Sequence, residues 1–183
     1  MTMILLFLLA CGPRHSTPPA VEAPIDAPTS PATLPTPYTA EQIRAAMPVG
    51  TTLRLSLSGT GPAPVEQRWR VTAADEAGCT IASTIVDPQT GAVLVDEGEG
   101  TSAWTELRDH AAFPAAFTTT STEDVDLPTG HIHALVYVVK PPDGPTRTFW
   151  FDPEHPGPPA RMVVAAPEGG APVEMIILER GAP

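Results

Sequence analysis

The sequence has 183 residues, and its 21 acidic residues outnumber its 10 lysines and arginines, giving a formal net charge of −11 at pH 7. Binding to nucleic acid requires a basic surface that neutralises phosphates, and adsorption to anionic lipid headgroups requires basic clusters. The charge therefore excludes both functions and mainly favours solubility.

The chain starts with a short apolar run, residues 4–10, that leads directly into Cys11. A transmembrane helix needs about 20 apolar residues, so this run is too short to span a membrane. The tetrapeptide Leu8-Leu9-Ala10-Cys11 resembles the lipobox of bacterial lipoproteins, and residues 1–10 resemble their signal peptide.

This resemblance implies that the chain is cut before Cys11, that Cys11 carries three lipid chains including palmitate, and that the rest is exported. Gly12 follows instead of Asp, which in this family's sorting pattern implies attachment to the outer membrane, facing the periplasm or the cell surface. Cys79 then remains as a single thiol, and one thiol makes no disulfide framework. We therefore expect a hydrophobic core to stabilise the exported domain, without a cofactor.

Residues 11–37 follow the predicted cleavage site and consist mostly of Pro, Ala, Thr and Ser. Such a segment buries too little apolar surface to offset the entropy of ordering, and its prolines keep it extended. At about 3.1 Å per residue in a polyproline II conformation, it reaches at most ~80 Å. We interpret it as a disordered tether that holds the folded part away from the bilayer.

A folded domain is predicted to begin near Tyr38 and to cover residues 38–183. Thr39 and Gln42 have the spacing of a helix capping box, and Pro48 ends the short helix that they start.

Beyond Gly50 the hydrophobic period changes from helical to two, which is typical of half-buried strands. Nine strands are predicted, at 52–57, 65–72, 79–86, 92–95, 117–125, 130–140, 146–152, 161–166 and 173–180. One further helix is predicted at 104–113, ended by Pro114. The pattern indicates a mainly β fold, a single curved antiparallel sheet with two short helices.

The last third of the chain carries a second resemblance. A Gly-led strand that starts within residues 127–131, paired aromatics at 148–151 and a proline-rich stretch at 156–163 precede a final apolar strand. This order resembles the carboxy-terminal half of periplasmic half-barrel families, including the outer-membrane lipoprotein carriers of the LolA/LolB type. It implies a half-barrel-like sheet around an apolar concavity plugged by short helices, although the chain has fewer predicted strands than a full carrier.

The candidate ligand-binding residues are aromatic or aliphatic side chains placed near this concavity: Trp104, Leu135, Tyr137, Phe149 and Trp150. In the strand at 130–140, one face carries His131, His133, Leu135, Tyr137 and Val139. This mixture suits a pocket with apolar walls and a few polar groups. The other face, with Ala134 and Val136, is wholly apolar and is predicted to be the core beneath a helix. The alternative for all five candidates is ordinary core, since the chain has only ten aromatic residues.

His131 and His133 alternate on a strand and so point to the same face. Such a pair can hold a transition metal with a third ligand, for which the candidates are His110, His155 and Asp152. The alternative is that two polar residues simply open a strand beside a turn.

Two other motifs have ordinary explanations. Residues 98–103 fit the Gly-x-Gly-x-x-Ala dinucleotide pattern, but Asp96, Glu97 and Glu99 would repel a pyrophosphate, so an acidic loop is expected instead. Cys79 has no neighbouring basic residue to lower its pKa, which favours a buried thiol over a nucleophile.

Three functions are compatible with these features. The first is a non-enzymatic cell-envelope lipoprotein whose curved sheet binds an apolar ligand or a partner protein. The second is a structural or assembly lipoprotein without a cavity, whose edge strands or tether meet a partner. The third is a metal-dependent hydrolase that uses His131 and His133.

Overall fold

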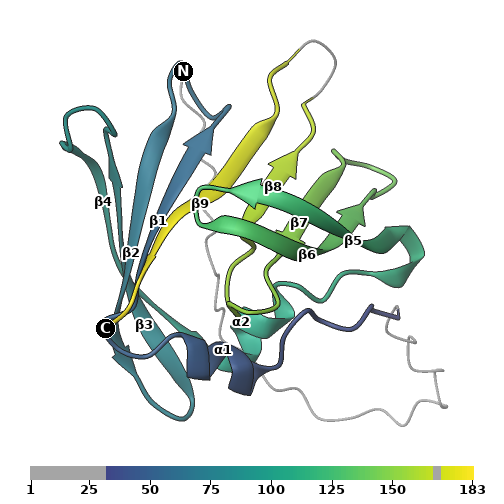
Figure 1. Cartoon of the computed structure of the whole chain (residues 1–183), viewed down its shortest axis with the longest axis horizontal. Helices are drawn as coiled ribbons and strands as arrows, with labels where there is room; N and C mark the ends of the chain where they lie inside the picture. The colour runs from purple at the N-terminus through teal and green to yellow at the C-terminus, as the bar shows by residue number, and fades with distance from the viewer. Residues whose placement is uncertain (1–31, 167–169) are drawn as a thin grey trace, which may run out of the picture. The chain divides into compact units, whose positions relative to one another are not determined.

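The computed structural model describes residues 32–166 and 170–183; the predicted signal peptide, Cys11 and most of the predicted tether lie outside them. Within these residues, one sheet contains nine strands in the order β4-β3-β2-β1-β9-β8-β7-β6-β5 (Figure 1). All neighbouring strands are antiparallel. The prediction of a mainly β fold with a single antiparallel sheet is confirmed, and the sheet is open because β4 and β5 each have one neighbour.

The strands follow the predicted alternation closely. Their bounds are β1 (Thr52–Ser58), β2 (Val65–Ala74), β3 (Gly78–Val86), β4 (Val93–Ala103), β5 (Thr118–Leu127), β6 (Gly130–Val139), β7 (Arg147–Phe151), β8 (Arg161–Val164) and β9 (Val173–Gly181). The first four form one meander and the last five another, and the pairing of β9 with β1 joins the two halves into one sheet (Figure 1).

Helix α1 (Ala40–Ala46) starts at the predicted capping box. The Gln42 backbone N–H donates to Thr39 Oγ1 over 3.2 Å, and the Thr39 N–H donates to Gln42 Oε1 over 2.8 Å. These two bonds satisfy amides that otherwise have no partner at a helix start. Helix α2 (Trp104–Asp109) contacts α1, so the two helices lie together on one face of the sheet (Figure 1).

Helix α2 is shorter than the predicted helix at 104–113. The Ala111 and Ala112 amides donate to the carbonyls of Arg108 and Asp109, three residues back, so the last turn tightens. Pro114 then disfavours the helical conformation for the residue before it. A short 3₁₀ helix, η1 (Ala115–Phe117), fills the space before β5.

Strand β4 is longer than predicted and includes the acidic segment for which the sequence predicts a loop. Residues 93–103 pair with β3, and the register shifts between Ser83 and Thr84. Gly98 lies opposite Ser83 with φ +73°, a left-handed conformation that glycine adopts at bulges. The acidic side chains are exposed on an edge strand, where water solvates them.

Residues 32–37, the last part of the predicted tether, contact the folded domain. The Leu34 N–H donates to the Phe113 carbonyl over 2.9 Å, and the Ala115 N–H donates to the Ala32 carbonyl over 2.8 Å. Tyr137 Oη donates to the Pro35 carbonyl over 3.0 Å. In the described part of the chain, the ordered structure thus starts before Tyr38.

The sheet has two faces with different coverings. We call the face under α1 and α2 the helix-covered face; its main cluster contains Ile43, Trp104 and Tyr137. The other, which we call the opposite face, buries Val125, Ala134 and Val136 near the β5 edge. No helix is needed there because β5 approaches β9 although three strands separate them in the sheet, so this end of the sheet curls on itself (Figure 1).

The prediction of which β6 face lies under the helices is wrong. Tyr137 and Val139 pack in the cluster on the helix-covered face, whereas Ala134 and Val136 lie on the opposite face. The small side chain of Ala134 has no exposed surface. Short side chains suit the curled end, where strands approach closely, and the large ring of Tyr137 fills the wider space below the helices.

Candidate functional site

An apolar pocket lies on the helix-covered face, between the helices and the sheet, with a volume of about 240 Å³. Both meanders and both helices contribute to its wall. The lining residues are Ile43, Met47, Trp69, Ile81, Leu107, His110, Ala111, Phe113, Phe149, Phe151, Gly157, Pro158, Pro159, Met162 and Met175. Of these described residues, His110 is the one with a titratable side chain, so the pocket favours apolar ligands.

The strand period explains why the wall is apolar. Trp69 of β2 and Ile81 of β3 belong to the first meander, and Phe149 and Met162, which lie opposite each other on β7 and β8, belong to the second. Residues of one sheet face alternate with those of the other, so the strand residues that line the pocket all come from one face of the sheet.

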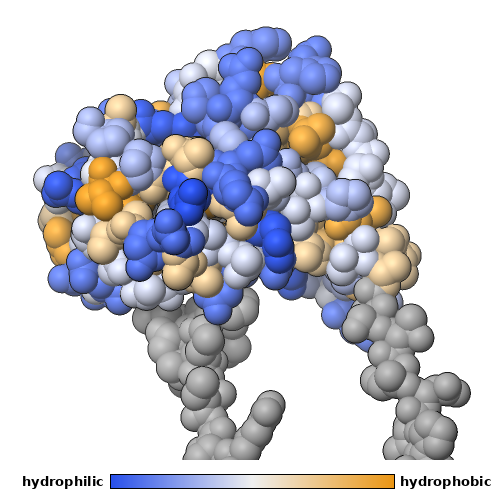
Figure 2. All heavy atoms as spheres, turned by 90° about the horizontal axis from the view of Figure 1, so that it is seen from below, coloured by the Kyte–Doolittle hydropathy of each residue, from blue (hydrophilic) through white to orange (hydrophobic). Residues whose placement is uncertain are grey.

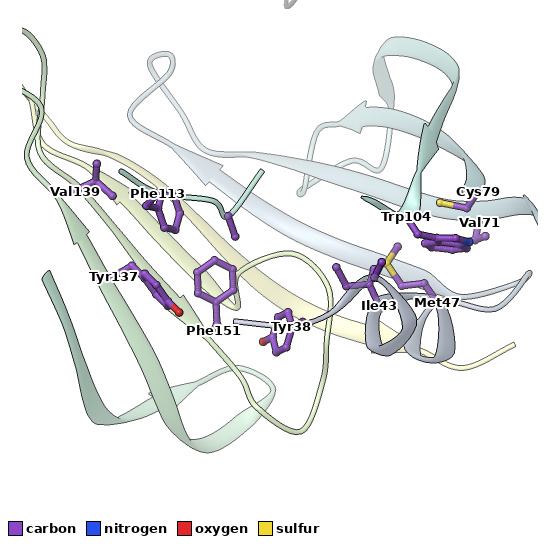
Figure 3. Packing of buried hydrophobic residues seen from close by; sticks show 12 residues of the cluster. Tyr38, Ile43, Met47, Val71, Cys79, Trp104, Phe113, Tyr137, Val139 and Phe151 are labelled. Carbon is purple, nitrogen blue, oxygen red and sulfur yellow. The ribbon is translucent and has the colours of Figure 1, made fainter. Parts of the chain in front are cut away.

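Aromatic rings form one side of the pocket and pack against each other. The Phe113 and Phe149 rings stack with centroids 4.7 Å apart, and Phe113 lies 5.4 Å from the Tyr137 ring. Figure 3 shows Phe113, Tyr137 and Phe151 on one side of the cluster and Trp104 on the other, with Tyr38 and α1 between them. Interlocked aromatic rings of this kind make a rigid wall.

The two helices position the remaining wall. Ile43 and Met47 project from α1 onto the sheet, and Leu107 does the same from α2. The loop between β7 and β8 closes one end, where a Cβ atom on Gly157 would lie 3.6 Å from Met47 Sδ. Methionine adapts its shape easily, so Met47 can adjust to what the pocket holds.

One of the five predicted ligand residues, Phe149, lines the pocket. Trp104 and Tyr137 belong to the same cluster but are buried beside the pocket, at 3% and 7% exposure. Trp104 Nε1 donates to the Asp75 carbonyl over 2.9 Å. Leu135 is partly buried against this cluster without lining the pocket.

Trp150 lies away from the other candidates, on the opposite face with Val136. Its Nε1 donates to Glu123 Oε2 over 2.9 Å, and the Arg161 guanidinium carbon lies 4.8 Å from its ring centroid. The paired aromatics therefore divide between the faces, because consecutive strand residues point in opposite directions.

The two predicted metal candidates lie on the exposed rim of the sheet. His131 Nδ1 is 2.8 Å from Asp126 Oδ1, and His133 Nδ1 is 2.7 Å from Asp124 Oδ1. Both aspartates lie on the neighbouring strand, β5. The Asp126 carboxylate raises the pKa of His131 through its hydrogen bond. The described residues contain no group of three His, Cys, Asp or Glu side chains suited to a metal ion; His155, a candidate third ligand, pairs with Asp152 instead.

Cys79 is buried, with 2% of its surface exposed, within the cluster on the helix-covered face. Burial raises the pKa of its thiol above the ordinary value. A protonated, buried thiol is a poor nucleophile, so its environment supports a packing role.

Several pocket residues were not among the predicted ligand residues. Trp69, Met162 and Met175 line the pocket, and so do prolines 158 and 159 of the β7–β8 loop. The alternation in β2 puts Trp69 on the same face as Val65 and Val71, but nothing local shows that this face shares a pocket with Met162 of β8.

No helix in the ranges 32–166 and 170–183 has the length and apolar character required to cross a membrane. On the face seen in Figure 2, hydrophobic residues form small separate groups among hydrophilic ones. The pocket, by contrast, is lined almost entirely by apolar side chains.

No family model matches the sequence, and no curated protein matches it. A candidate lipoprotein from Parabacteroides distasonis has 9% identity and a TM-score of 0.47, over 74% of this chain and 98% of that chain. The MucA/MucB complex of Pseudomonas aeruginosa has 12% identity and a TM-score of 0.49, over 77% of this chain and 54% of that chain. A candidate exported protein with a YmcC-like fold from Bacteroides fragilis has 12% identity and a TM-score of 0.43, over 74% of this chain and 98% of that chain. Likenesses this distant say nothing about what this chain binds.

Proposed function

We propose that this protein is a non-enzymatic, lipid-anchored protein of the cell envelope that binds a small apolar ligand between its helices and its sheet. The observation that carries the proposal is the pocket itself, whose apolar wall is built from both meanders and both helices. A shared wall of this kind holds a ligand at the centre of the domain.

The size of the pocket limits the ligand. Its volume of about 240 Å³ is slightly below the range of roughly 300–1,000 Å³ typical of sites for drug-sized molecules. A small hydrophobic molecule, or the end of a longer chain, fits this volume. Transfer of the ligand's apolar surface from water supplies the affinity.

The envelope location in this proposal depends on the lipobox resemblance and on the proline-rich composition that follows it. Lipid chains on Cys11 would hold the protein to the outer membrane, since several chains anchor stably where one does not. The tether would leave the pocket free to meet a ligand at some distance from the bilayer.

Two observations support a binding role over catalysis. Cys79 is buried with a raised thiol pKa, and the exposed His131 and His133 are each bonded to an aspartate. Neither group borders the pocket.

The proposal is tested with N-phenyl-1-naphthylamine, an uncharged apolar dye whose fluorescence rises in a hydrophobic site. Met162 and Val163 are consecutive, half-buried residues of β8, and Met162 alone of the two lines the pocket. Met162→Trp should fill the pocket and weaken dye binding at least about tenfold, while Val163→Trp should leave it unchanged. Leu107→Trp is a second blocking variant on α2. Equal binding by the parent and all three variants, with circular dichroism showing them folded, would refute the proposal.

A partner protein is a second candidate, which the β4 edge favours. Val93, Leu94 and Val95 are 62%, 54% and 44% exposed on this edge strand. Unpaired backbone groups beside exposed apolar residues are a template for another strand. Leu94→Lys should then abolish capture of a defined envelope partner while leaving dye binding intact; capture that survives the substitution would count against this candidate.

A further inference from the structure

A second cavity, of about 430 Å³, adjoins the apolar pocket. The two share Met47, at the end of α1, and Pro158, in the β7–β8 loop, as a common wall. The rest of the second cavity is formed by the last turn of α1 and the residues up to β1, the start of β1, the end of β9 with the residues after it, and the loop that carries Glu154 and His155. Four polar side chains, those of Thr51, Glu154, His155 and Arg180, interrupt its otherwise apolar lining, whereas His110 alone does so in the neighbouring pocket.

Two residues that border this cavity each carry a buried polar atom without a partner in the described chain. Among the described residues, three buried side-chain polar atoms have no hydrogen-bond partner: Thr51 Oγ1, Thr118 Oγ1 and Arg180 Nη2. Thr51 and Arg180 both border the second cavity. Buried polar atoms normally find partners, so two such atoms at one cavity indicate that something outside the described chain satisfies them.

The Arg180 guanidinium lies near one acid, Asp152, but is not paired with it. It forms no ion pair with any described residue, unlike Arg54, Arg68, Arg108 and Arg161. The nearby Asp152 carboxylate is already bonded, through Oδ1 to the Glu154 N–H over 3.0 Å and through Oδ2 to His155 Nδ1 at 2.7 Å. Burial lowers the pKa of the Arg180 guanidinium, while Tyr38 and Asp152 act in the opposite direction. An arginine stays charged even so, and therefore retains its need for an acceptor.

We propose that this cavity binds the anionic head group, a carboxylate or a phosphate, of an amphiphile whose apolar chain occupies the adjoining pocket. The proposal rests on the proposed apolar-ligand function and names the chemistry of its polar end. The guanidinium fork of Arg180 suits an oxyanion, and the hydroxyl of Thr51 can donate a further hydrogen bond to it.

The wall between the two cavities is compatible with one ligand that reaches both. Met47 is buried and its thioether chain has three rotatable bonds, so a small rotamer change opens a passage. Glu154 carries the one acidic side chain among the described residues that border the head-group cavity, and it is exposed. Its negative charge repels an anion, so the change in affinity when this charge is removed shows whether the bound ligand is anionic.

The test uses the full chain and isothermal titration with three probes of equal chain length: decanoate, decyl phosphate and uncharged decanol. Decanoate or decyl phosphate should bind about ten- to a hundredfold more tightly than decanol, since hydrogen bonds between charged partners are the strong ones. The anion that binds more tightly identifies the preferred head group.

The variants separate the head-group cavity from the apolar pocket. Arg180→Met should reduce anion binding to the level of decanol while leaving decanol binding unchanged, and Thr51→Val should act in the same direction more weakly. Glu154→Gln, at an exposed position, should tighten binding of the anions alone. Arg161→Met is the matched control, because this half-buried arginine pairs with Glu174 on the opposite face.

The outcomes are distinguishable. Decanol that binds as tightly as both anions, with no change in Glu154→Gln, would overturn the head-group assignment and leave the apolar-ligand function standing. Failure of all three probes to bind the parent protein would refute both the head-group assignment and the apolar-ligand function. If Arg180→Met does not fold, the Thr51→Val and Glu154→Gln results decide the question.

Discussion

Tyr38 and Asp152 join two segments that are 114 residues apart: Tyr38 Oη donates a hydrogen bond of 2.6 Å to the Asp152 backbone carbonyl. The Tyr38 ring is 4% exposed and packs edge-on against Phe151, with centroids 5.8 Å apart. This bond fixes the entry to α1 against the end of β7, where the loop that borders both cavities begins.

Tyr38→Phe should therefore destabilise the domain by about 1–2 kcal/mol, because the Asp152 carbonyl loses its partner in a buried place. Burial raises the pKa of the Tyr38 hydroxyl. The folded state thus holds this proton more tightly than the unfolded state, and stability should fall as the pH rises above about 10, the ordinary tyrosine value. Urea unfolding at pH 7 and pH 10.5 measures both effects, and Tyr38→Phe should lose less stability between them than the parent. An unchanged midpoint at pH 7 would contradict the assigned bond.

Glu66 should make the domain sensitive to acid. It is buried at 3% exposure on β2, and its oxygens accept from Arg54 Nε at 3.0 Å, Arg54 Nη2 at 2.9 Å and Arg68 Nε at 2.6 Å. The hydrogen bonds from Arg54, followed by those from Arg68, hold the pKa of Glu66 below its usual range despite burial. The stability that Glu66 contributes is therefore fully present above the unfolded value of about 4.3 and is lost as the pH falls through the folded pKa.

Glu66→Gln should lower the free energy of unfolding by about 1–3 kcal/mol at pH 7. This is less than for a fully buried ion pair, because Arg54 is half exposed. The variant should also lose less stability than the parent below about pH 4. Glu179→Gln is the matched control: Glu179 pairs with the same Arg54 over 2.6 Å but is exposed, so its loss should stay within about 0.5 kcal/mol. Equal costs for the two substitutions would show that burial of Glu66 does not matter.

The start of the stable unit can be located by truncation. A chain beginning at Ala32 should be as stable as one beginning at Cys11, whereas one beginning at Tyr38 should lose about 1–3 kcal/mol. The longer form keeps the bonds of Leu34 to Phe113 and of Tyr137 to Pro35. Both should give circular dichroism spectra dominated by strand. Equal stability of the two forms would show that residues 32–37 do not stabilise the domain and belong to the tether.

The curled end of the sheet predicts a sharp effect at Val136. This residue is 3% exposed on the opposite face, where it packs in a hydrophobic cluster with Val125 and Ala134. Val136→Asp should unfold the domain, since an unpaired buried carboxylate costs several kcal/mol. His133→Ala, on an exposed part of the same strand, should change stability by less than about 0.5 kcal/mol. A folded Val136→Asp variant at pH 7 would show that this end of the sheet is open to water.

The proposed anchor has its own test. Cys11→Ala should release the protein from the membrane fraction or leave it in the wrong compartment, because the attachment point for the lipid chains is gone. Cys79→Ala is the matched control, since it removes the other cysteine, which is buried in the domain, and should not affect fractionation. Unchanged membrane association of Cys11→Ala would refute the lipoprotein interpretation.

The sequence by itself determined the class of the fold. Period-two alternation from Leu53 onward and turn residues between the runs predicted nine strands, and the structure contains nine in its described residues. The Thr39–Gln42 capping box was equally readable. These features are local: each depends on residues a few positions apart, whose geometry the backbone period fixes.

Only the tertiary structure decided which residues form the pocket. Alternation shows that Phe149 and Trp150 point to opposite faces, but both faces of β6 and β7 are apolar, so nothing local says which one the helices cover. The answer depends on the pairing of β9 with β1, which brings Trp69 and Met162 to one wall, and on the curling of β5 toward β9, which buries the other face. The sequence likewise does not reveal that Arg180 Nη2 has no hydrogen-bond partner among the described residues, because this depends on contacts between strands and loops far apart in the chain.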